Sequence, residues 1–264
     1  MSTLNWSGQV HPEPCTFLLG ADETTNQPVT MTFGTEFDKG ECPHLWVAGG
    51  AATGKTELLV LLASQAALKG WDVITVDTSP TGISHSAGNP VGARALTFTG
   101  VDAQGDSNLL VEFVNLGQEL NRRTELLQAH GVETIAQLPS EVTAGLTGGK
   151  PVRPMLVLID TVTAGMLAEH KFDISYLAGW ESFGAGIHLV VTASGTTAGS
   201  LLVSSPFRGR IHLGEASEEV LKQTLGAMSA QIAPAAPGRA GTGLYTYGPG
   251  KPVTAFRAYL APSA

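Results

Sequence analysis

The chain has 264 residues, of which 43% are hydrophobic and 14% charged, and its formal net charge is −8. This composition predicts a substantial core and excludes gross disorder, and the acidic balance argues against a surface that is basic overall, as in many nonspecific nucleic-acid binders. Cys15 and Cys42 are the only cysteines and lack a metal-type spacing, which indicates a reducing, cytoplasmic setting without a disulfide framework. We expect no signal peptide and no membrane-spanning segment, because the longest apolar run, residues 58–68, is interrupted by Ser64 and Gln65.

The N-terminal region predicts a leading β-hairpin. We expect residues 1–14 to be loosely ordered and residues 15–42 to form the hairpin, with strands at 15–20 and 28–33. Both segments are rich in β-type residues, and the turn-rich sequence ADETTNQ lies between them.

The most specific motif of the chain follows this hairpin. The sequence GGAATGKT satisfies the phosphate-loop pattern G-x-x-x-x-G-K-[ST], and its members are Gly49, Gly50, Ala51, Ala52, Thr53, Gly54, Lys55 and Thr56. In such a loop, backbone N–H groups converge on phosphate oxygens, the lysine adds a positive charge, and the hydroxyl can ligate Mg²⁺. An ordinary glycine-rich turn is the alternative, but an apolar strand at 44–48 and an apolar helix at 56–69 flank the loop. The motif therefore predicts ATP and Mg²⁺ as cofactors.

Strands and helices continue to alternate along the rest of the chain. We predict strands at 71–77, 96–98, 155–160, 187–193 and 209–213, an amphipathic helix at 106–130, and a closing hairpin from 244–247 and 253–259. Such alternation predicts an α/β fold, with a mainly parallel, twisted sheet and helices on both of its faces. We expect residues 1–264 to form a single domain.

A second part of the nucleotide site is expected at the end of the strand MLVLID, where Asp160 would orient the Mg²⁺ ion or its waters. The alternative is a strand-terminal aspartate that caps a turn. Many ring ATPases carry a glutamate at the next position as a general base, but here it is Thr161, which cannot take a proton at neutral pH. Glu169 could not simply replace it if the chain continues as a helix, so either another carboxylate serves or hydrolysis is slow or absent.

Several segments, in order along the chain, resemble the FtsK/SpoIIIE branch of P-loop ATPases. CPHLWVAGGAATGKTELL resembles the phosphate-loop entry of that family, GQELNRRTELLQAHGVETIAQLP its helix–turn segment, FGAGIHLVVTAS its GIHLILATQ strand, and SPFRGRIHLG its TRI strand. PGRAGTGLY and the glutamate of GKTELL are similar to type VII secretion ATPase domains. The resemblance covers nearly the whole chain.

This resemblance implies a RecA-like core and a homohexameric ring that binds nucleotide between subunits. It adds Glu57 to the nucleotide-binding residues and implies catalytic roles for Asp160, for Ser194, which replaces a glutamine that senses the γ-phosphate, and for Arg210, the first candidate for an arginine finger. The next finger candidates are Arg122 and Arg123, and for all three arginines a surface or intramolecular salt bridge is the alternative. Arg239 could also approach a nucleotide, with a solvated loop side chain as the alternative.

The function that the resemblance implies is ATP-driven movement of double-stranded DNA through the ring. The chain lacks the membrane anchor and the winged-helix module of chromosome motors, which predicts a free cytoplasmic protein, and no Lys/Arg cluster marks a phosphate track. Two alternatives stay open. Thr161 favours an ATP-binding assembly or regulatory module that barely hydrolyses ATP, and Glu57 with PGRAG favours a protein-transport ATPase like the type VII motors.

Overall fold

The computed structural model describes residues 4–34, 37–77, 83, 96–99, 105–146, 148–162, 177–194, 207–226, 240–248 and 250–260. Its strands are β1 (Thr16–Asp22), β2 (Pro28–Phe33), β3 (Glu41–Cys42), β4 (Leu45–Gly49), β5 (Asp72–Asp77), β6 (Leu96–Thr99), β7 (Met155–Val162), β8 (Ile187–Ser194), β9 (Gly209–Leu213), β10 (Thr242–Thr246) and β11 (Thr254–Ala258). Its helices are α1 (Lys55–Leu68), α2 (Gly105–His130), α3 (Ser140–Thr143), α5 (Trp180–Gly184) and α6 (Glu218–Leu225), with 3-10 turns η1 (Phe37–Lys39) and η3 (Ile135–Gln137).

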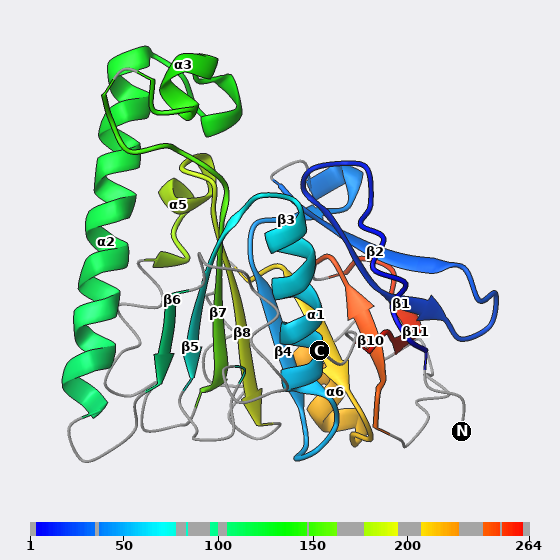
Figure 1. Ribbon diagram of the computed structural model, residues 1–264. Helices are drawn as coiled ribbons and strands as arrows, with labels where there is room; N and C mark the ends of the chain where they lie inside the picture. The colour runs from blue at the N-terminus through cyan, green and yellow to red at the C-terminus, as the bar shows by residue number, and fades with distance from the viewer. Residues whose placement is uncertain are drawn as a thin grey trace.

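The described strands form one 11-stranded sheet in the order β3-β2-β1-β11-β10-β9-β4-β8-β7-β5-β6 (Figure 1). The strands from β9 to β6 pair in parallel, as the alternation of strands and helices predicts. Both predicted hairpins are present, β1–β2 and β10–β11, and they extend the sheet with antiparallel pairs. The hairpins also pair with each other through β1 and β11, which joins the two ends of the chain.

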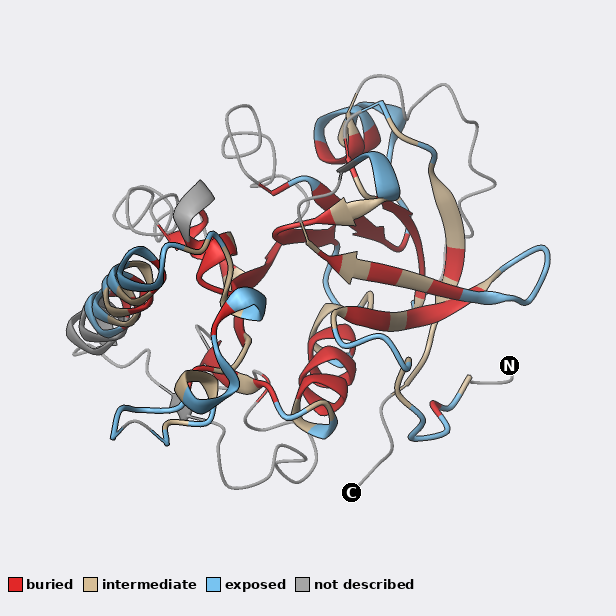
Figure 2. Cartoon of the chain, turned by 90° about the horizontal axis from the view of Figure 1, so that it is seen from above, coloured by how far each residue is buried: buried red, intermediate tan, exposed pale blue. Residues whose placement is uncertain are grey.

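The central strands are buried on both faces, which explains their nearly continuous apolar sequences (Figure 2). In β7, Leu156 and Leu158 belong to the core cluster that contains the side chains of α1, whereas Val157 and Ile159 belong to the cluster that contains those of α2. Side chains alternate across a strand, so one strand supplies both cores. The prediction of helices on both faces is confirmed.

Helix α1 is fixed to the N-terminal hairpin by a buried glutamine. The register of β1 against β2 shifts between Leu18 and Gly20, and this bulge leaves the main chain of Leu18 free to bond elsewhere. The Leu18 N–H donates to Gln65 Oε1 at 2.8 Å, and Gln65 Nε2 donates to the Leu18 carbonyl at 2.8 Å. Gln65, a polar residue within the apolar helix, therefore satisfies the backbone N–H and carbonyl of Leu18 at the bulge.

The close approach of β1 to β11 gives a testable prediction. A Cβ at Gly20 would overlap the carbonyl oxygen of Arg257 in β11, a backbone atom that cannot move without disturbing the pairing. We expect Gly20→Ala to lower the free energy of unfolding by about 2 kcal/mol, as overpacked sites do, measured by urea denaturation. Gly149→Ala is the control, since a Cβ there meets nothing within 4 Å. Equal stability of the two variants would contradict the prediction.

Part of the N-terminal segment packs against the other end of the chain. Within residues 1–14, which we expected to be loosely ordered, Trp6 is buried in the core cluster of α1, and its backbone N–H donates to the carbonyl of Leu260 at 2.9 Å. Asn5 forms a β-bridge with Leu260, so the two ends of the chain lie together. Burial of the large apolar indole stabilises this segment despite its polar neighbours. No helix in the described ranges is both long and apolar enough to cross a lipid bilayer.

Candidate nucleotide-binding site

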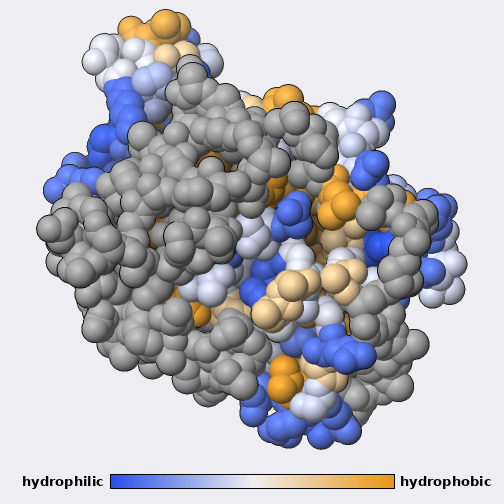
Figure 3. Space-filling view, turned by 60° about the horizontal axis from the view of Figure 1, so that its bottom comes forward, coloured by the Kyte–Doolittle hydropathy of each residue, from blue (hydrophilic) through white to orange (hydrophobic). Residues whose placement is uncertain are grey.

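The phosphate-loop motif forms the turn between β4, which ends at Gly49, and α1, which begins at Lys55. Gly54 is the N-cap of α1 and has a φ of 101°, a left-handed conformation that glycine adopts without strain. The loop lies at the carboxyl edge of the parallel strands, the edge at which α/β sheets bind ligands. Figure 3 turns this edge of the molecule toward the viewer.

The loop is held by close packing against the neighbouring strand ends. A Cβ at Gly49 would lie 2.6 Å from both the Leu213 carbonyl oxygen and Thr53 Oγ1. From the segment before β10, the Gly241 N–H donates to the Thr53 carbonyl at 3.0 Å. The shape of the loop is therefore set by β9 and β10 as well as by its own sequence.

Lys55 folds back over the loop. Its Nζ donates to the carbonyls of Gly49 at 3.0 Å and Gly50 at 2.6 Å. Burial lowers the pKa of Lys55, and the charge of Asp160 opposes this effect. The ammonium thus lies inside the loop, where the motif requires a positive charge to meet phosphate oxygens.

The predicted partner of the loop, Asp160, lies beside it. The Thr56 hydroxyl donates to Asp160 Oδ2 at 2.8 Å, and Asp160 is 2% exposed. The strand order β4-β8-β7 and the parallel pairing bring these residues, 104 positions apart, to one edge of the sheet.

The residues present fit a magnesium–nucleotide complex. In the part of the chain that the structure describes, no three His, Cys, Asp or Glu side chains cluster as metal ligands. Mg²⁺ does not need such a cage, because it is usually bound through one or two protein oxygens together with phosphates and waters. Thr56 and Asp160 supply hard oxygen atoms of this kind next to the phosphate loop.

Thr161 occupies the position where a glutamate would act as general base. Its φ is 59°, which is unusual for a β-branched residue, and its hydroxyl donates to Asp160 Oδ1 at 3.1 Å. The side chain is therefore directed back to the carboxylate of Asp160 and offers no proton acceptor that is basic at neutral pH.

Two further predicted residues lie at the same edge of the sheet. Ser194 ends β8 and its backbone is in register with Gly49, so it borders the loop, although its side chain lies outside the described residues. Glu57 is exposed in the first turn of α1. Their predicted roles at the nucleotide stay predictions.

Arg210, the first finger candidate, is 8% exposed within this chain. It lies on β9, where Nε is 3.4 Å from the Phe207 carbonyl and Nη1 is 3.5 Å from the Thr224 carbonyl at the end of α6. Burial lowers its pKa. In this conformation the guanidinium bonds to carbonyls of its own chain, and a role at a neighbour's nucleotide stays a prediction.

The other finger candidates lie elsewhere. Arg122 and Arg123 both bond to Glu119 on α2, and Arg123 also donates to the carbonyl of Ala185, just before β8 begins. This is the edge of the sheet opposite the phosphate loop. Arg239 lies outside the described residues.

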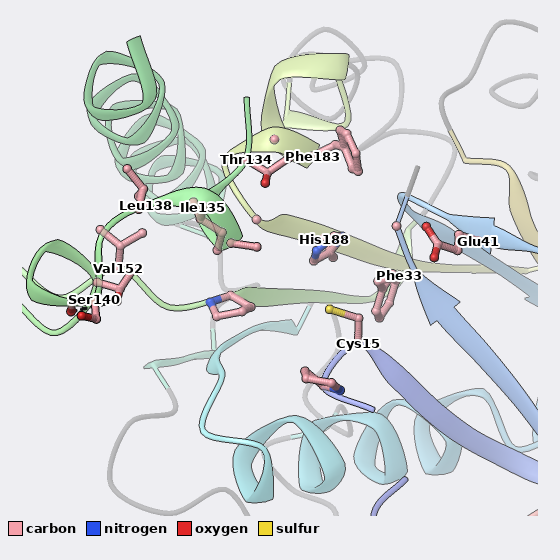
Figure 4. Close-up of a pocket in the computed structure, with 17 residues that line it drawn as sticks. Cys15, Phe33, Glu41, Thr134, Ile135, Leu138, Ser140, Val152, Phe183 and His188 are labelled. Atoms are coloured by element: carbon pink, nitrogen blue, oxygen red, sulfur yellow. Dashed lines mark hydrogen bonds between the residues drawn. The ribbon is translucent and has the colours of Figure 1, made fainter. Parts of the chain in front are cut away.

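The same opposite edge carries a cavity of about 690 Å³ that the sequence did not predict (Figure 4). Its walls are mostly apolar and come from the start of β8, the turn after α2 and the N-terminal hairpin; they include Cys15, Phe33, Ile135, Phe183 and His188. His188 stacks on Phe33 with ring centroids 4.8 Å apart, and burial lowers its pKa to about 4, so the ring is neutral at physiological pH.

Sequence reasoning also missed Thr192. This threonine of β8 is 0% exposed and donates to Asp160 Oδ1 at 2.9 Å. The available signal was a second polar residue, besides His188, within the mostly apolar strand IHLVVTA, because packing of a buried parallel strand does not need a hydroxyl there.

No protein-family model and no curated protein matches the chain. Solved structures with a similar fold include the cytoplasmic domain of the Thermomonospora curvata type VII secretion ATPase EccC, with a TM-score of 0.71 and 17% identity over 98% of this chain and 32% of that one. The pCW3 conjugation coupling protein TcpA, in a monomer form with ATPγS, has a TM-score of 0.68 and 19% identity over 98% of this chain and 70% of that one. EssC (ATPases 2 and 3) from Geobacillus thermodenitrificans has a TM-score of 0.70 and 14% identity over 99% of this chain and 47% of that one.

The chain thus spans about a third of the EccC structure and about half of the EssC structure. At these identities the likeness shows a shared fold, and it agrees with the phosphate loop, the Asp160 strand and the order of the sheet. In fold, this chain is similar to the EccC, TcpA and EssC structures.

Proposed function

We propose that the chain binds ATP with Mg²⁺ at Gly49–Thr56 and acts as a subunit of a homohexameric ring that moves double-stranded DNA. The observation that carries the nucleotide site is the 2.8 Å hydrogen bond from Thr56 to Asp160, which joins the phosphate loop to the strand-terminal carboxylate. Support for a motor comes from the fold that the chain shares with a conjugation coupling protein, itself solved with ATPγS.

Each residue of the site has a separate task in this proposal. The loop N–H groups and Lys55 would bind the phosphates, with the lysine exchanging its bonds to Gly49 and Gly50 for phosphate oxygens. Asp160 would orient Thr56 and the waters of the ion. When bound, Mg²⁺ supplies charge neutralisation of the triphosphate.

The homohexameric ring has less support than the nucleotide site. A nucleotide bound between subunits would need an arginine from the neighbour, and Arg210 would have to leave the carbonyls of Phe207 and Thr224 to serve. Arg122 is the more exposed alternative, with 35% of its side chain accessible, although it is paired with Glu119.

ATPase and assembly measurements test the proposal. We expect turnover that rises when duplex DNA is added and that is lost in Lys55→Ala, together with a sixfold mass in mass photometry with ATP and Mg²⁺. Lys150→Ala is a matched control, because this lysine is 65% exposed and bonds to Glu119 on α2. A strict monomer at micromolar concentration, with DNA-independent turnover, would contradict the motor.

The conformation of Thr161 favours a second candidate, an assembly or regulatory module that binds ATP but barely hydrolyses it. Its hydroxyl faces Asp160, and the site offers no glutamate at that position. ATP binding and ring formation with turnover no higher than that of Lys55→Ala would support this function over the motor.

A protein-transport role is the third outcome. Its support is the fold shared with EccC, which has also been solved in complex with a signal sequence peptide, at a TM-score of 0.62 and 16% identity. Turnover stimulated by a protein cargo and indifferent to duplex DNA would favour it.

A further inference from the structure

A β-bulge lies at the centre of the nucleotide site. Strands β7 and β8 pair Ile159 with Val191 and Val162 with Ala193, so two residues of β7, Asp160 and Thr161, face the single residue Thr192 of β8. An extra residue of this kind bends its strand and redirects side chains, and such bulges occur often beside active sites.

Thr192 bonds to both residues of the bulge. Its Oγ1 accepts a hydrogen bond from the Thr161 N–H at 2.6 Å and donates one to Asp160 Oδ1 at 2.9 Å. One hydroxyl can do both at once, because it has one proton to donate and lone pairs to accept with. The side chain is 0% exposed, so water does not compete for these bonds.

The backbone of Thr161 shows that the bulge is held in place. A φ of 59° is unfavourable for a β-branched residue and persists only where its surroundings impose it. The bond from its N–H to Thr192 is one such constraint, and the bond from its hydroxyl to Asp160 is another.

The two oxygens of Asp160 consequently have different partners. Oδ1 accepts from Thr192 and Thr161, whereas Oδ2 accepts from Thr56. The Thr56 hydroxyl donates its proton to Oδ2, so the lone pairs of its oxygen stay available for a cation. The orientation of Asp160 thus controls the orientation of Thr56.

We propose that Thr192 is a positioning residue of the magnesium–nucleotide site, which holds Asp160 by Oδ1 so that Oδ2 stays on the Thr56 hydroxyl. The inference deepens the proposed function and rests on it. Outer partners of metal ligands commonly change metal affinity 10- to 100-fold when they are removed. Thr192 would act through Asp160, to which its hydroxyl donates, and not as a ligand itself.

The test is a Mg²⁺ titration of nucleotide binding by the full chain, followed with a fluorescent ATP analogue. We expect Thr192→Val, which keeps the shape and removes the hydroxyl, to raise the Mg²⁺ concentration at half-saturation about tenfold. Binding measured in EDTA should not change, because the loop and Lys55 are untouched. Thr192→Ser, which restores the hydroxyl, should return the Mg²⁺ requirement to within about threefold of wild type.

Thr75→Val is the matched control. Thr75 lies on β5, two strands from β8, is 2% exposed, and its hydroxyl has no hydrogen-bond partner within the described structure. The same chemical change there should leave the Mg²⁺ requirement unaltered. If Thr192→Val does not fold, Thr192→Cys replaces it, since a thiol is a weak donor and acceptor and should give an intermediate shift.

The outcomes separate the two proposals. Mg²⁺-dependent binding by wild type that is unchanged in Thr192→Val, or shifted equally in Thr75→Val, overturns the positioning role and leaves the proposed function intact. The absence of Mg²⁺-dependent binding in wild type overturns the proposed function, and with it this inference.

Discussion

Replacing Lys55 with alanine is expected to lower the affinity for ATP about 100-fold while leaving the fold intact. Two or more charge-assisted hydrogen bonds to the triphosphate are lost, and about 3 kcal/mol of binding free energy corresponds to roughly that factor. The fold should persist because, among the described residues, the hydrogen bonds of Lys55 go only to the carbonyls of its own loop, Gly49 and Gly50, which can be solvated instead. Isothermal titration calorimetry measures the affinity and circular dichroism the fold.

Lys69→Ala is the control on the same helix. Lys69 also donates to two backbone carbonyls, those of His11 at 2.6 Å and Glu13 at 2.7 Å, but it lies at the other end of α1. Its removal should loosen the N-terminal segment without changing ATP affinity. An equal loss of ATP affinity in both variants would show that the lysines act through helix stability, and an unfolded Lys55→Ala would show a structural role for this lysine.

The second large effect is expected at Arg123, on the edge of the sheet opposite the phosphate loop. Its side chain is 1% exposed and bonds to Glu119 at 2.8 Å and to the carbonyls of Arg153 at 2.8 Å and Ala185 at 2.9 Å. Arg123→Ala removes the pairing and leaves two carbonyls and a void in the interior. We expect a loss of about 3 kcal/mol or more of unfolding free energy, measured by urea denaturation.

Arg122→Ala provides the comparison, because Arg122 bonds to the same glutamate but has 35% of its side chain exposed. Solvent screens such a pair, so its removal should cost less than about 1 kcal/mol. Similar losses in the two variants would show that the charge of Glu119, and not the burial of Arg123, determines the effect.

Glu119 also predicts a pH dependence of this stabilisation. Burial by itself raises its pKa, but the hydrogen bonds from Arg122 and Arg123 outweigh it and lower the pKa to about 2. A carboxyl whose pKa is depressed on folding stabilises the protein above its unfolded value, near 4.5, and that contribution is lost as the pH falls toward 2. The difference between wild type and Arg123→Ala should therefore shrink on acidification through this window.

Much of the fold was predictable because its signals are local. Apolar runs such as residues 155–160 and 187–193 mark strands buried on both faces, and the spacing of Phe113, Leu116 and Leu120 marks the face of α2 that packs on the sheet. The short helices α3 and α5 were not predicted, since four or five residues are too few to show a helical period.

The pairing of distant segments was less accessible. The join of β1 to β11, and with it the burial of Trp6, depends on which two hairpin edges meet, and hydrophobic pattern does not encode that choice. The partners of Arg210 and Arg123 were equally inaccessible from the sequence, which made both residues candidates for an arginine finger. In the structure, both guanidinium groups bond to carbonyls of their own chain.

By itself, the sequence determined the chemistry of the phosphate loop and the identity of Asp160, because a motif of fixed spacing and a carboxylate at the end of an apolar strand are local properties. Only the tertiary structure decided how Asp160 is held. The bulge in β7 and the bonds of Thr192 join residues more than 30 positions apart, through the register of two strands. That register follows from the packing of the whole sheet, so the sequence of a single segment does not determine it.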